Sequence, residues 1–384
     1  MKQETLFSIF FTFLRFGFLA WGGPVAQIAM IRDELVGKRG WISSNKFNKI
    51  LAIYQALPGP EAHEICVYFG MIKRGRVGAF LAGLGFMLPG LVLILLLAWA
   101  YQIYGATALL PLFVGIAPAV SALIIRSAHR ISKHLLYDRS LILAGAVSAV
   151  LTLLQVHFVL VFLVCAVWRY LFVNTQKNLA YLFSAALIFL SLSITLYFPS
   201  FGVIKNSATT SNLFVEGLKA GLLSFGGAYT AIPFLQASMV GHYAAITPSS
   251  FLDGIALASI IPAPLVIFGT YLGFLAGGLC GALLITLGIF LPAFLFTILG
   301  HKQIEKVVEN KTLHSLLDGI GSGVVGMLVI TALQIFLHNI NGTLPAIIFA
   351  VAMTGFYFWK HRLSVPVVIL ACGVFGYLIE LYRI

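Results

Sequence analysis

Three ionisable side chains follow a Pro-Gly-Pro sequence in an otherwise apolar part of the chain. Glu61, His63 and Glu64 come directly after Pro58-Gly59-Pro60. Ionisable residues inside apolar membrane segments are energetically costly and usually serve a function. A carboxyl group beside a bound anion suits a proton carrier, because burial favours the neutral form of a carboxyl group. The pattern therefore predicts proton coupling, with Glu61, His63 and Glu64 as the candidate residues.

Each of these residues also has a purely structural interpretation. Glu61 can complement the positive end of the helix that it begins, and His63 can act as a buried hydrogen-bonding group. An intramembrane enzyme built on the same three residues is a further alternative, but no nucleophile with a partner accompanies them. The chain has no Gly-rich phosphate loop, HExxH or GxSxG sequence. We therefore expect no catalytic residue, no metal site and no cofactor.

Glycine and proline break the apolar segments at several points. In hydrocarbon every backbone N–H and C=O group needs a partner, so a break is tolerated only where protein covers it or where it lines a watery cavity. A helix that begins in mid-membrane points free N–H groups and a positive dipole end inward, which suits an anion. Kinks and close-packing glycines are the alternative. The candidate anion site consists of Gly22, Gly23, Pro24, Gln27, Pro58, Gly59, Pro60, Gly226, Gly227, Pro262, Ala263 and Pro264.

Two basic residues precede the Gly-Gly breaks. Arg15 and Lys219 occupy matched positions (219 − 15 = 204), one or two turns before Gly22-Gly23 and Gly226-Gly227. They are candidates to supply positive charge to the anion site. Alternatively, each side chain extends to the nearest membrane interface.

The composition is that of a membrane protein. The chain has 384 residues, of which 60% are hydrophobic and 9% are charged, whereas about a quarter of the residues in soluble domains are charged. Apolar runs long enough to cross a bilayer as helices recur without period-2 alternation. The net charge of +12 is explained by basic cytoplasmic loops more simply than by nucleic-acid binding. We expect an all-α polytopic protein in the lipid bilayer, with no nucleic-acid partner.

Glycines and prolines of the first half recur in the second half in one register. Gly22 matches Gly226 and Pro58 matches Pro262, both 204 positions on (226 − 22 = 262 − 58 = 204), and the offset later becomes 203. Ten such matches indicate duplication. We expect a first repeat at 1–177, a linker with one membrane span at 178–212 and a second repeat at 213–384.

Matched loops of the two repeats carry opposite amounts of positive charge. The basic stretch 73–76 matches neutral residues in the second half, whereas the basic stretch 302–311 matches neutral residues near 98–107. Since positive charge marks the cytoplasmic side, the repeats are expected to have inverted topology, as in many secondary transporters. Independent drift of the loop charges is the alternative.

With an extra span in the linker, inversion requires an even number of membrane crossings in each repeat. We therefore expect Ser44–Met71 to enter the membrane and return, turning at Pro58-Gly59-Pro60, with a second re-entrant hairpin at Gly22-Gly23-Pro24. Leu179–Phe198 is an expected extra span in the linker. Arg126–Arg139 is expected to form a basic loop.

Several of these segments resemble the chromate transporter family. The first repeat carries Phe18–Pro24 (FLAWGGP), Leu57–Ala62 (LPGPEA) and Gly78–Pro89 (GAFLAGLGFMLP), and the second carries Leu223–Gly227 (LSFGG) and Gly281–Pro292 (GALLITLGIFLP). The resemblance implies a multi-pass carrier in the plasma membrane, the inner membrane in bacteria, that exports chromate. We expect such a transporter to work by alternating access. Its implied substrates are small inorganic oxyanions related to sulfate.

The sequence leaves some functional alternatives open. Pro262-Ala263-Pro264 stands where a second Pro-Gly-Pro is usual in the family, and His63-Glu64 stands where neutral amides are expected. An anion channel, a transporter of a different small anion and a structural membrane protein are the alternatives. A homodimer is one of the oligomeric states left open.

Overall fold

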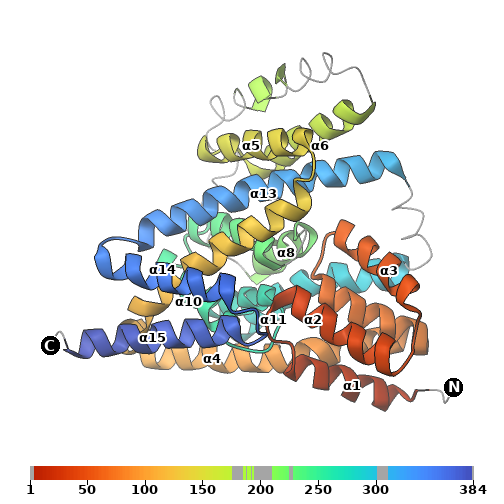
Figure 1. The fold of residues 1–384 in the computed structure, drawn as a ribbon, viewed down its shortest axis with the longest axis horizontal. Helices are drawn as coiled ribbons and strands as arrows, with labels where there is room; N and C mark the ends of the chain where they lie inside the picture. Colours follow the sequence, from red (N-terminus) through yellow and green to blue (C-terminus); the bar gives the residue numbers. More distant parts are fainter. Residues whose placement is uncertain are drawn as a thin grey trace.

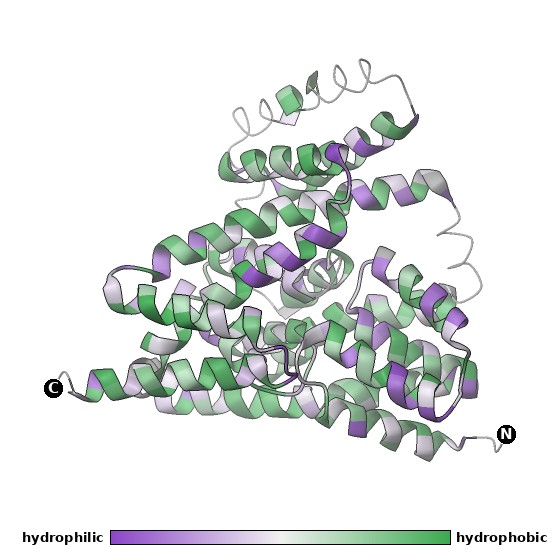
Figure 2. Cartoon of the chain, in the orientation of Figure 1, coloured by the Kyte–Doolittle hydropathy of each residue, from purple (hydrophilic) through white to green (hydrophobic). Residues whose placement is uncertain are grey.

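The chain forms a bundle of helices whose outer faces are apolar. The computed structural model describes residues 4–174, 185–186, 188–191, 193, 210–224, 228–300 and 310–382, and every regular element in this part is a helix. Figure 1 shows the arrangement of these helices, and Figure 2 shows that hydrophobic residues predominate along them. Large apolar side chains such as Phe7, Leu96 and Phe358 are exposed, as lipid-facing side chains are. The predicted all-α membrane fold is confirmed.

The two halves of the chain place the same kinds of helix in the same order. The first half consists of α1 (Leu6–Phe18), α2 (Gly23–Arg32), the π-helical turn η1 (Asp33–Lys38), α3 (Ser44–Ala56), α4 (Glu61–Leu135), α5 (Arg139–Leu153) and α6 (Phe158–Asn174). The second half consists of α8 (Thr210–Leu222), η2 (Ala228–Thr230), α9 (Ala231–Leu235), the π-helical turn η3 (Gln236–His242), α10 (Pro248–Ser259), η4 (Leu265–Ile267), α11 (Phe268–Gly300), α13 (Lys311–Asn339), α14 (Thr343–Phe358) and α15 (Ser364–Tyr382). Both halves therefore contain a π-helical turn at matched places, before α3 in the first half and before α10 in the second.

Helix α4 is a hairpin followed by a second long helix. A straight helix of 75 residues would be about 110 Å long, more than twice the thickness of a bilayer. The chain instead reverses at Gly75, whose φ is +61°, and a Cβ on Gly70 would lie 2.2 Å from the carbonyl oxygen of Gly78. Residues 61–74 therefore pack antiparallel to residues 76–104, and Pro111–Leu135 forms the second long helix.

Helix α11 repeats this hairpin in the second half. Gly278 has a φ of +59°, and a Cβ on Gly273 would lie 2.6 Å from the carbonyl oxygen of Gly281. The hydroxyl groups of Thr270 and Thr286 are hydrogen-bonded across the hairpin at 2.6 Å. Glycine is needed at the matched turns because an L side chain is strained at this φ.

Matched glycines also make matched contacts between helices. A Cβ on Gly85 would lie 2.7 Å from the carbonyl oxygen of Phe10, and a Cβ on Gly288 would lie 2.4 Å from that of Phe214. Both members of the second pair stand 203 or 204 positions after those of the first. The sequence repeat is thus a repeat of backbone packing, in which α1 lies on residues 76–104 as α8 lies on α11.

Two re-entrant hairpins open the first repeat, as predicted. In the first hairpin, α2 and η1 return along α1, since the Gln27 amide bonds to the Ala20 carbonyl group at 2.9 Å and the Arg39 guanidinium to the Thr12 hydroxyl group at 3.2 Å. In the second, α3 returns along residues 61–74, with ring centroids 6.2 Å apart for Phe47 and Phe69 and 6.0 Å apart for Trp41 and Phe69.

The long helices of the two repeats cross in opposite directions. Ser121 and Asn339 are hydrogen-bonded at 3.0 Å, and Tyr137 and Asp318 at 2.5 Å. As the chain runs forward from Ser121 to Tyr137, its contacts on α13 run backward from Asn339 to Asp318. The two equivalent helices, Pro111–Leu135 and α13, are therefore antiparallel, as Figure 1 also shows. The repeats have the inverted arrangement that the sequence predicts.

One predicted loop is part of a helix. The expected basic loop Arg126–Arg139 is wrong, because α4 continues without a break to Leu135. The stretch contains no glycine or proline, and Ala128 and Ile131 are buried at helical spacing. Arg126 and Arg130 are therefore partly buried on a helix, whereas Lys133 is exposed on it.

The linker cannot be compared with its prediction. Most of the expected span Leu179–Phe198 and most of 178–212 lie outside the described residues. Within the described part of the first repeat, two segments are long and apolar enough to cross a membrane, Glu61–Tyr104 and Pro111–Leu135. The boundaries 1–177, 178–212 and 213–384 remain predictions.

Candidate functional site

The first break lies between α1 and α2 and leaves a free helix N-terminus. Gly22 and Gly23 have φ values of +86° and +78°, Pro24 occupies the first turn of α2, and no side chain caps it. A Cβ on Gly22 would lie 2.8 Å from the carbonyl oxygen of Arg362, whereas one on Gly23 would meet nothing within 4 Å. The backbone N–H groups in the first turn of α2 therefore lie beside open space and are available to an anion.

Gln27 joins this break to the break of the second repeat. Its side chain is buried, and its Nε2 donates to the carbonyl groups of Ala20 at 2.9 Å and Ala263 at 3.1 Å. The Gln27 amide oxygen is buried without a hydrogen-bond partner among the described residues. Because Ala263 is the central residue of Pro262-Ala263-Pro264, one side chain connects broken helices from both repeats.

The Pro58-Gly59-Pro60 break makes the equivalent contact with the second repeat. The Gly59 N–H donates to the carbonyl group of Ser224 at 2.8 Å, and Gly59 has a φ of +148°. Ser224 matches Ala20 (224 − 20 = 204) and Ala263 matches Gly59 (263 − 59 = 204). Each Pro-X-Pro break is therefore joined to the end of the first helix of the opposite repeat.

The carboxyl group of Glu64 is buried against the first Pro-Gly-Pro break. Glu64 is fully buried, and neither carboxyl oxygen has a hydrogen-bond partner among the described residues. A Cβ on Gly59 would lie 2.4 Å from its Oε1. Glycine at position 59 thus makes room for this carboxyl group.

Glu61 and His63 lie on the same helix but in different surroundings. Glu61 is buried, contacts the Gln55 amide and lies within electrostatic reach of Arg130. His63 is fully buried, with its ring centroid 4.9 Å from those of Phe290 and Phe294. The three proton-coupling candidates are therefore close together, although His63 faces an apolar wall formed by α11.

The second repeat contributes a partly described break. Gly226 and Gly227 lie outside the described residues. Pro264 precedes η4, whose N-terminus has no side-chain cap, and a Cβ on Gly90 would lie 2.4 Å from the Cβ of Ala263. Pro262, Ala263 and Pro264 therefore pack against the first repeat.

The two basic candidates do not join these residues. Arg15 is exposed on α1, away from the buried contacts of the breaks. Lys219 pairs with the Glu216 carboxylate at 2.7 Å, and this carboxylate also accepts from the Tyr243 hydroxyl group at 3.4 Å.

Arg126 and Arg130 approach the breaks instead, and the sequence interpretation missed them. Both are partly buried on Pro111–Leu135. Arg130 lies within electrostatic reach of Glu61, and Arg126 within reach of Tyr229, two residues after Gly227. The available signal was the helical spacing of the buried residues around them.

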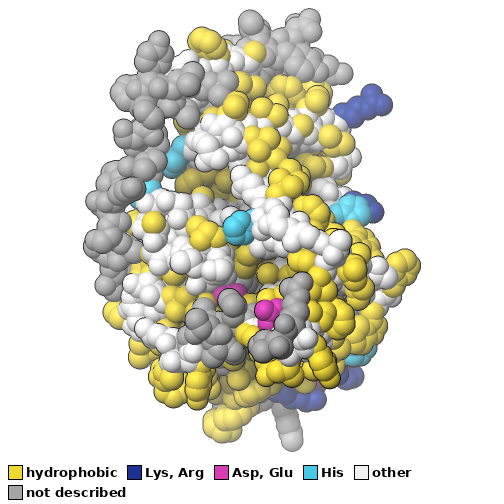
Figure 3. Space-filling model, turned by 90° about the vertical axis from the view of Figure 1, so that its left-hand side faces the viewer, with side chains coloured by type: hydrophobic (Ala, Val, Ile, Leu, Met, Phe, Trp, Pro, Cys, Tyr) yellow, Lys and Arg dark blue, Asp and Glu magenta, His cyan; other side chains and the backbone are white. Residues whose placement is uncertain are grey.

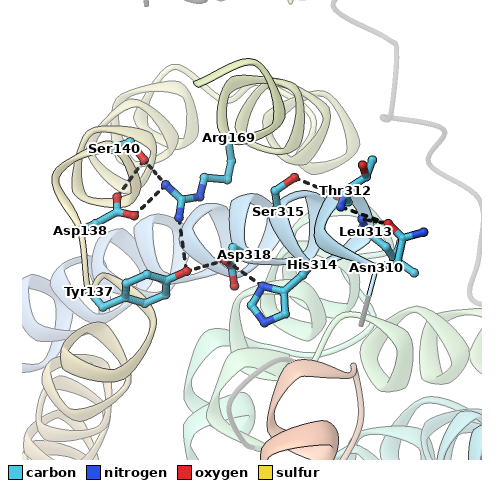
Figure 4. Close-up of polar contacts among 10 residues, drawn as sticks. All are labelled: Tyr137, Asp138, Ser140, Arg169, Asn310, Thr312, Leu313, His314, Ser315 and Asp318. Atoms are coloured by element: carbon cyan, nitrogen blue, oxygen red, sulfur yellow. Dashed lines mark hydrogen bonds and ion pairs between the residues drawn. The ribbon is translucent and has the colours of Figure 1, made fainter. Parts of the chain in front are cut away.

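A polar cluster joins the repeats at one end of the long helices. Figure 4 shows Arg169 beside Asp138 and Ser140, with Tyr137 between Arg169 and Asp318. The Arg169 guanidinium lies 2.7 Å from the Asp138 carboxylate, and the Tyr137 hydroxyl group donates to Asp318 at 2.5 Å. Because Asp318 belongs to α13, this cluster ties the α4–α5 linker and α6 to the second repeat.

A second polar cluster lies around Asp253 of α10. Its carboxylate is buried and accepts from the Tyr101 hydroxyl group at 2.8 Å, and the Tyr101 and Tyr271 ring centroids are 5.4 Å apart. Figure 3 shows Asp and Glu side chains in a hollow of the face at the left of Figure 1. The Asp253 carboxylate is thus held by the Tyr101 hydroxyl group.

Two other features are separate from the breaks. A surface cavity of about 390 Å³ lies between α2, η1 and α3, and its lining includes Arg32, Asp33 and Ser44. Among the described residues no three His, Cys, Asp or Glu side chains form a group that could hold a metal ion.

Comparisons with known proteins agree with the resemblance seen in the sequence. The family model for the chromate transporter matches residues 7–170 and 211–377. A chromate transport protein of Pseudomonas aeruginosa is 46% identical, with 97% of this chain and 92% of the relative covered. A chromate transport protein of Cupriavidus metallidurans is 28% identical, with the same shares covered. No solved structure matches the chain.

Proposed function

Because the chain belongs to the chromate transporter family, we propose that this multi-pass plasma-membrane protein is a secondary transporter of chromate or a related tetrahedral oxyanion. Its relatives are named transport proteins, not enzymes. The observation that carries the proposal is the joint between the two repeats. There the Gly59 N–H bonds to Ser224, and the Gln27 amide joins Ala20 to Ala263.

The chemistry of this joint suits an anion. The N-termini of α2, residues 61–74 and η4 begin at Gly or Pro without side-chain caps, so backbone N–H groups and positive dipole ends are available. The break residues Gly22, Gly23, Pro24, Gln27, Pro58, Gly59, Pro60, Gly226, Gly227, Pro262, Ala263 and Pro264 are proposed to surround the oxyanion.

The inverted repeat suits alternating access. Two equivalent bundles related by inversion have two conformations of similar energy, one open to each side of the membrane. The basic ends of the helices, such as residues 73–76, are proposed to face the cytoplasm. Export of chromate, with the oxyanion passing between the Pro-X-Pro breaks, is the proposed direction.

Proton coupling is proposed for the carboxyl groups behind the first break. Glu64 is buried and unpaired beside Gly59, and an unpaired carboxylate charge is costly there. Glu61 is the neighbour through which a proton reaches it. His63 is the third candidate. Because its surroundings are apolar, we propose that it contributes least to proton transfer.

The test is flux of radiolabelled chromate and sulfate into vesicles that contain the purified protein. We expect a saturable rate in the wild type and loss of flux in Gly59→Leu and Glu61→Gln, with insertion unchanged. Gln102→Leu, at an exposed position, is the matched control and should keep the wild-type rate.

The alternatives give different results in the same assay. A rate that does not saturate indicates an anion channel, and unchanged flux in both variants removes the proposed site. Competition of chromate with sulfate, molybdate and phosphate identifies the preferred oxyanion. A rate that is independent of the pH gradient contradicts the role proposed for Glu61 and Glu64.

A further inference from the structure

Two arginines lie at the crossing of the two long helices. Pro111–Leu135 and α13 meet through Ser121 and Asn339 near one end and through Tyr137 and Asp318 near the other. Residues 126–130 fall between these two contacts and therefore opposite the middle of α13. Figure 2 shows hydrophilic residues in this C-terminal half of Pro111–Leu135. Arg126 and Arg130 are both partly buried there, and a charged side chain inside a bundle of membrane helices usually serves a function.

The surroundings of Arg126 come from the second repeat. Its guanidinium carbon lies 5.8 Å from the ring centroid of Phe356, and Tyr229 lies within electrostatic reach. Phe356 is near the end of α14, and the following loop places the Arg362 backbone against Gly22. Arg126 therefore lies beside the end of α14 and close to η2.

Arg130 approaches the Pro-Gly-Pro break. It lies one helical turn after Arg126, and each guanidinium is in the field of the other. Glu61 lies within electrostatic reach and starts the helix that follows Pro60. The two arginines thus lie between η2 of the second repeat and Glu61, the first residue of the helix that follows Pro60.

Neither arginine is neutralised by a close carboxylate. Among the described residues, no carboxylate oxygen lies within 4.0 Å of a nitrogen of Arg126 or Arg130, whereas Arg39, Arg169 and Lys219 all form such pairs. Two like charges one turn apart destabilise each other. A doubly charged anion between them removes this repulsion and matches the geometry of two guanidinium groups.

We propose that Arg126 and Arg130 bind the transported oxyanion and select dianions over monoanions, an inference that rests on the proposed function. The matched stretch of the second repeat, residues 329–334, contains no Lys or Arg. The two repeats therefore share one pair of cations, as expected for a single substrate site near their pseudo-symmetry axis. Glu61 faces Arg130 as a weak internal competitor that the oxyanion replaces.

The experiment uses the full-length protein in vesicles, with chromate, sulfate and the monoanion nitrate as probes. We expect Arg126→Gln and Arg130→Gln to raise the KM for chromate about tenfold or more, because a lost charge contact in a buried site costs at least that much. Protection by sulfate against thermal unfolding should be lost in both variants. Lys133→Gln, an exposed position on the same helix, should keep the wild-type KM.

Two further measurements separate binding from a structural role. Arg126→Lys and Arg130→Lys keep the charge but lose the planar fork, and we expect an intermediate KM. If Arg130 serves only to neutralise Glu61, the double variant Glu61→Gln/Arg130→Gln will regain protection by sulfate. We expect no such recovery, so recovery would overturn the proposal.

The outcomes distinguish this inference from the proposed function. If wild-type vesicles transport neither chromate nor sulfate, the proposed function fails. If the wild type transports them and both glutamine variants keep its KM and its preference for sulfate over nitrate, the arginine site alone fails. A variant that does not fold is replaced by the corresponding lysine variant, which is judged on the same selectivity.

Discussion

At the scale of single residues, the site depends on polar groups that must be satisfied without water. The Gln27 amide supplies donors to two carbonyl groups that the breaks leave free, one from each repeat. Gly59 leaves space for the Glu64 carboxyl group. These residues are small or uncharged because a helix break in a membrane exposes backbone groups that side chains must partner.

Replacing Gln27 tests this role directly. Gln27→Leu leaves the carbonyl groups of Ala20 and Ala263 without this donor, and we expect the free energy of unfolding to fall by about 1–3 kcal/mol. The measurement is denaturation of the detergent-solubilised protein. Gln102→Leu, at an exposed position, is the control; an equal loss of stability in both variants would contradict the proposed bridge.

At the scale of elements, the polar cluster of Figure 4 holds α6 and the α4–α5 linker to α13. Burial raises the pKa of the Asp138 carboxyl group, but the Leu141 N–H, the Ser140 hydroxyl group and the Arg169 guanidinium lower it more. The resulting pKa lies below the ordinary value of 3.8. The charged form of Asp138 is therefore the one that the folded protein prefers.

This shift gives a pH dependence with a definite sign. A lowered folded-state pKa adds stability that is fully present above the ordinary pKa of 3.8 and is lost as pH falls through the folded-state value. We expect Arg169→Met to be destabilised at pH 7 and to lose part of this dependence between about pH 5 and pH 2. Thermal unfolding across this range is the measurement. Arg139→Met, next to Asp138 but exposed, is the control, and identical pH profiles for both variants would exclude the pair.

At the scale of the whole molecule, the inverted repeat decides where each hairpin tip lies. The tip at Gly75 belongs to the first repeat and the tip at Gly278 to the second. The two hairpins have equivalent backbone contacts: Gly70 packs against Gly78 in the first, and Gly273 packs against Gly281 in the second. Because the repeats are inverted, equivalent tips must face opposite sides of the membrane.

Cysteine labelling checks this arrangement with a residue that the chain already has. Cys280 is exposed near the Gly278 tip, whereas Cys66, Cys165 and Cys372 are buried. We expect a membrane-impermeant maleimide to label Cys280 from outside intact cells. Lys73→Cys in a Cys280→Ser background should be labelled only after the membrane is opened. Labelling of both positions from the same side would rule out the inverted topology.

The sequence by itself determined the repeat, the inversion and the two re-entrant hairpins. These features depend on glycine, proline and loop charge. The effects of these residues are local, so they can be predicted without knowing how the helices pack. The matched contacts of Gly85 and Gly288 and the turn at Pro58-Gly59-Pro60 were therefore within reach of the sequence.

Only the tertiary structure decided which side chains meet at the breaks. It turned most of the expected loop Arg126–Arg139 into a helix that partly buries Arg126 and Arg130, while Arg15 stayed exposed and Lys219 was paired with Glu216. The face that a helix presents to its neighbours is set by long-range packing. The local sequence of a helix does not show which helix of the other repeat packs against it.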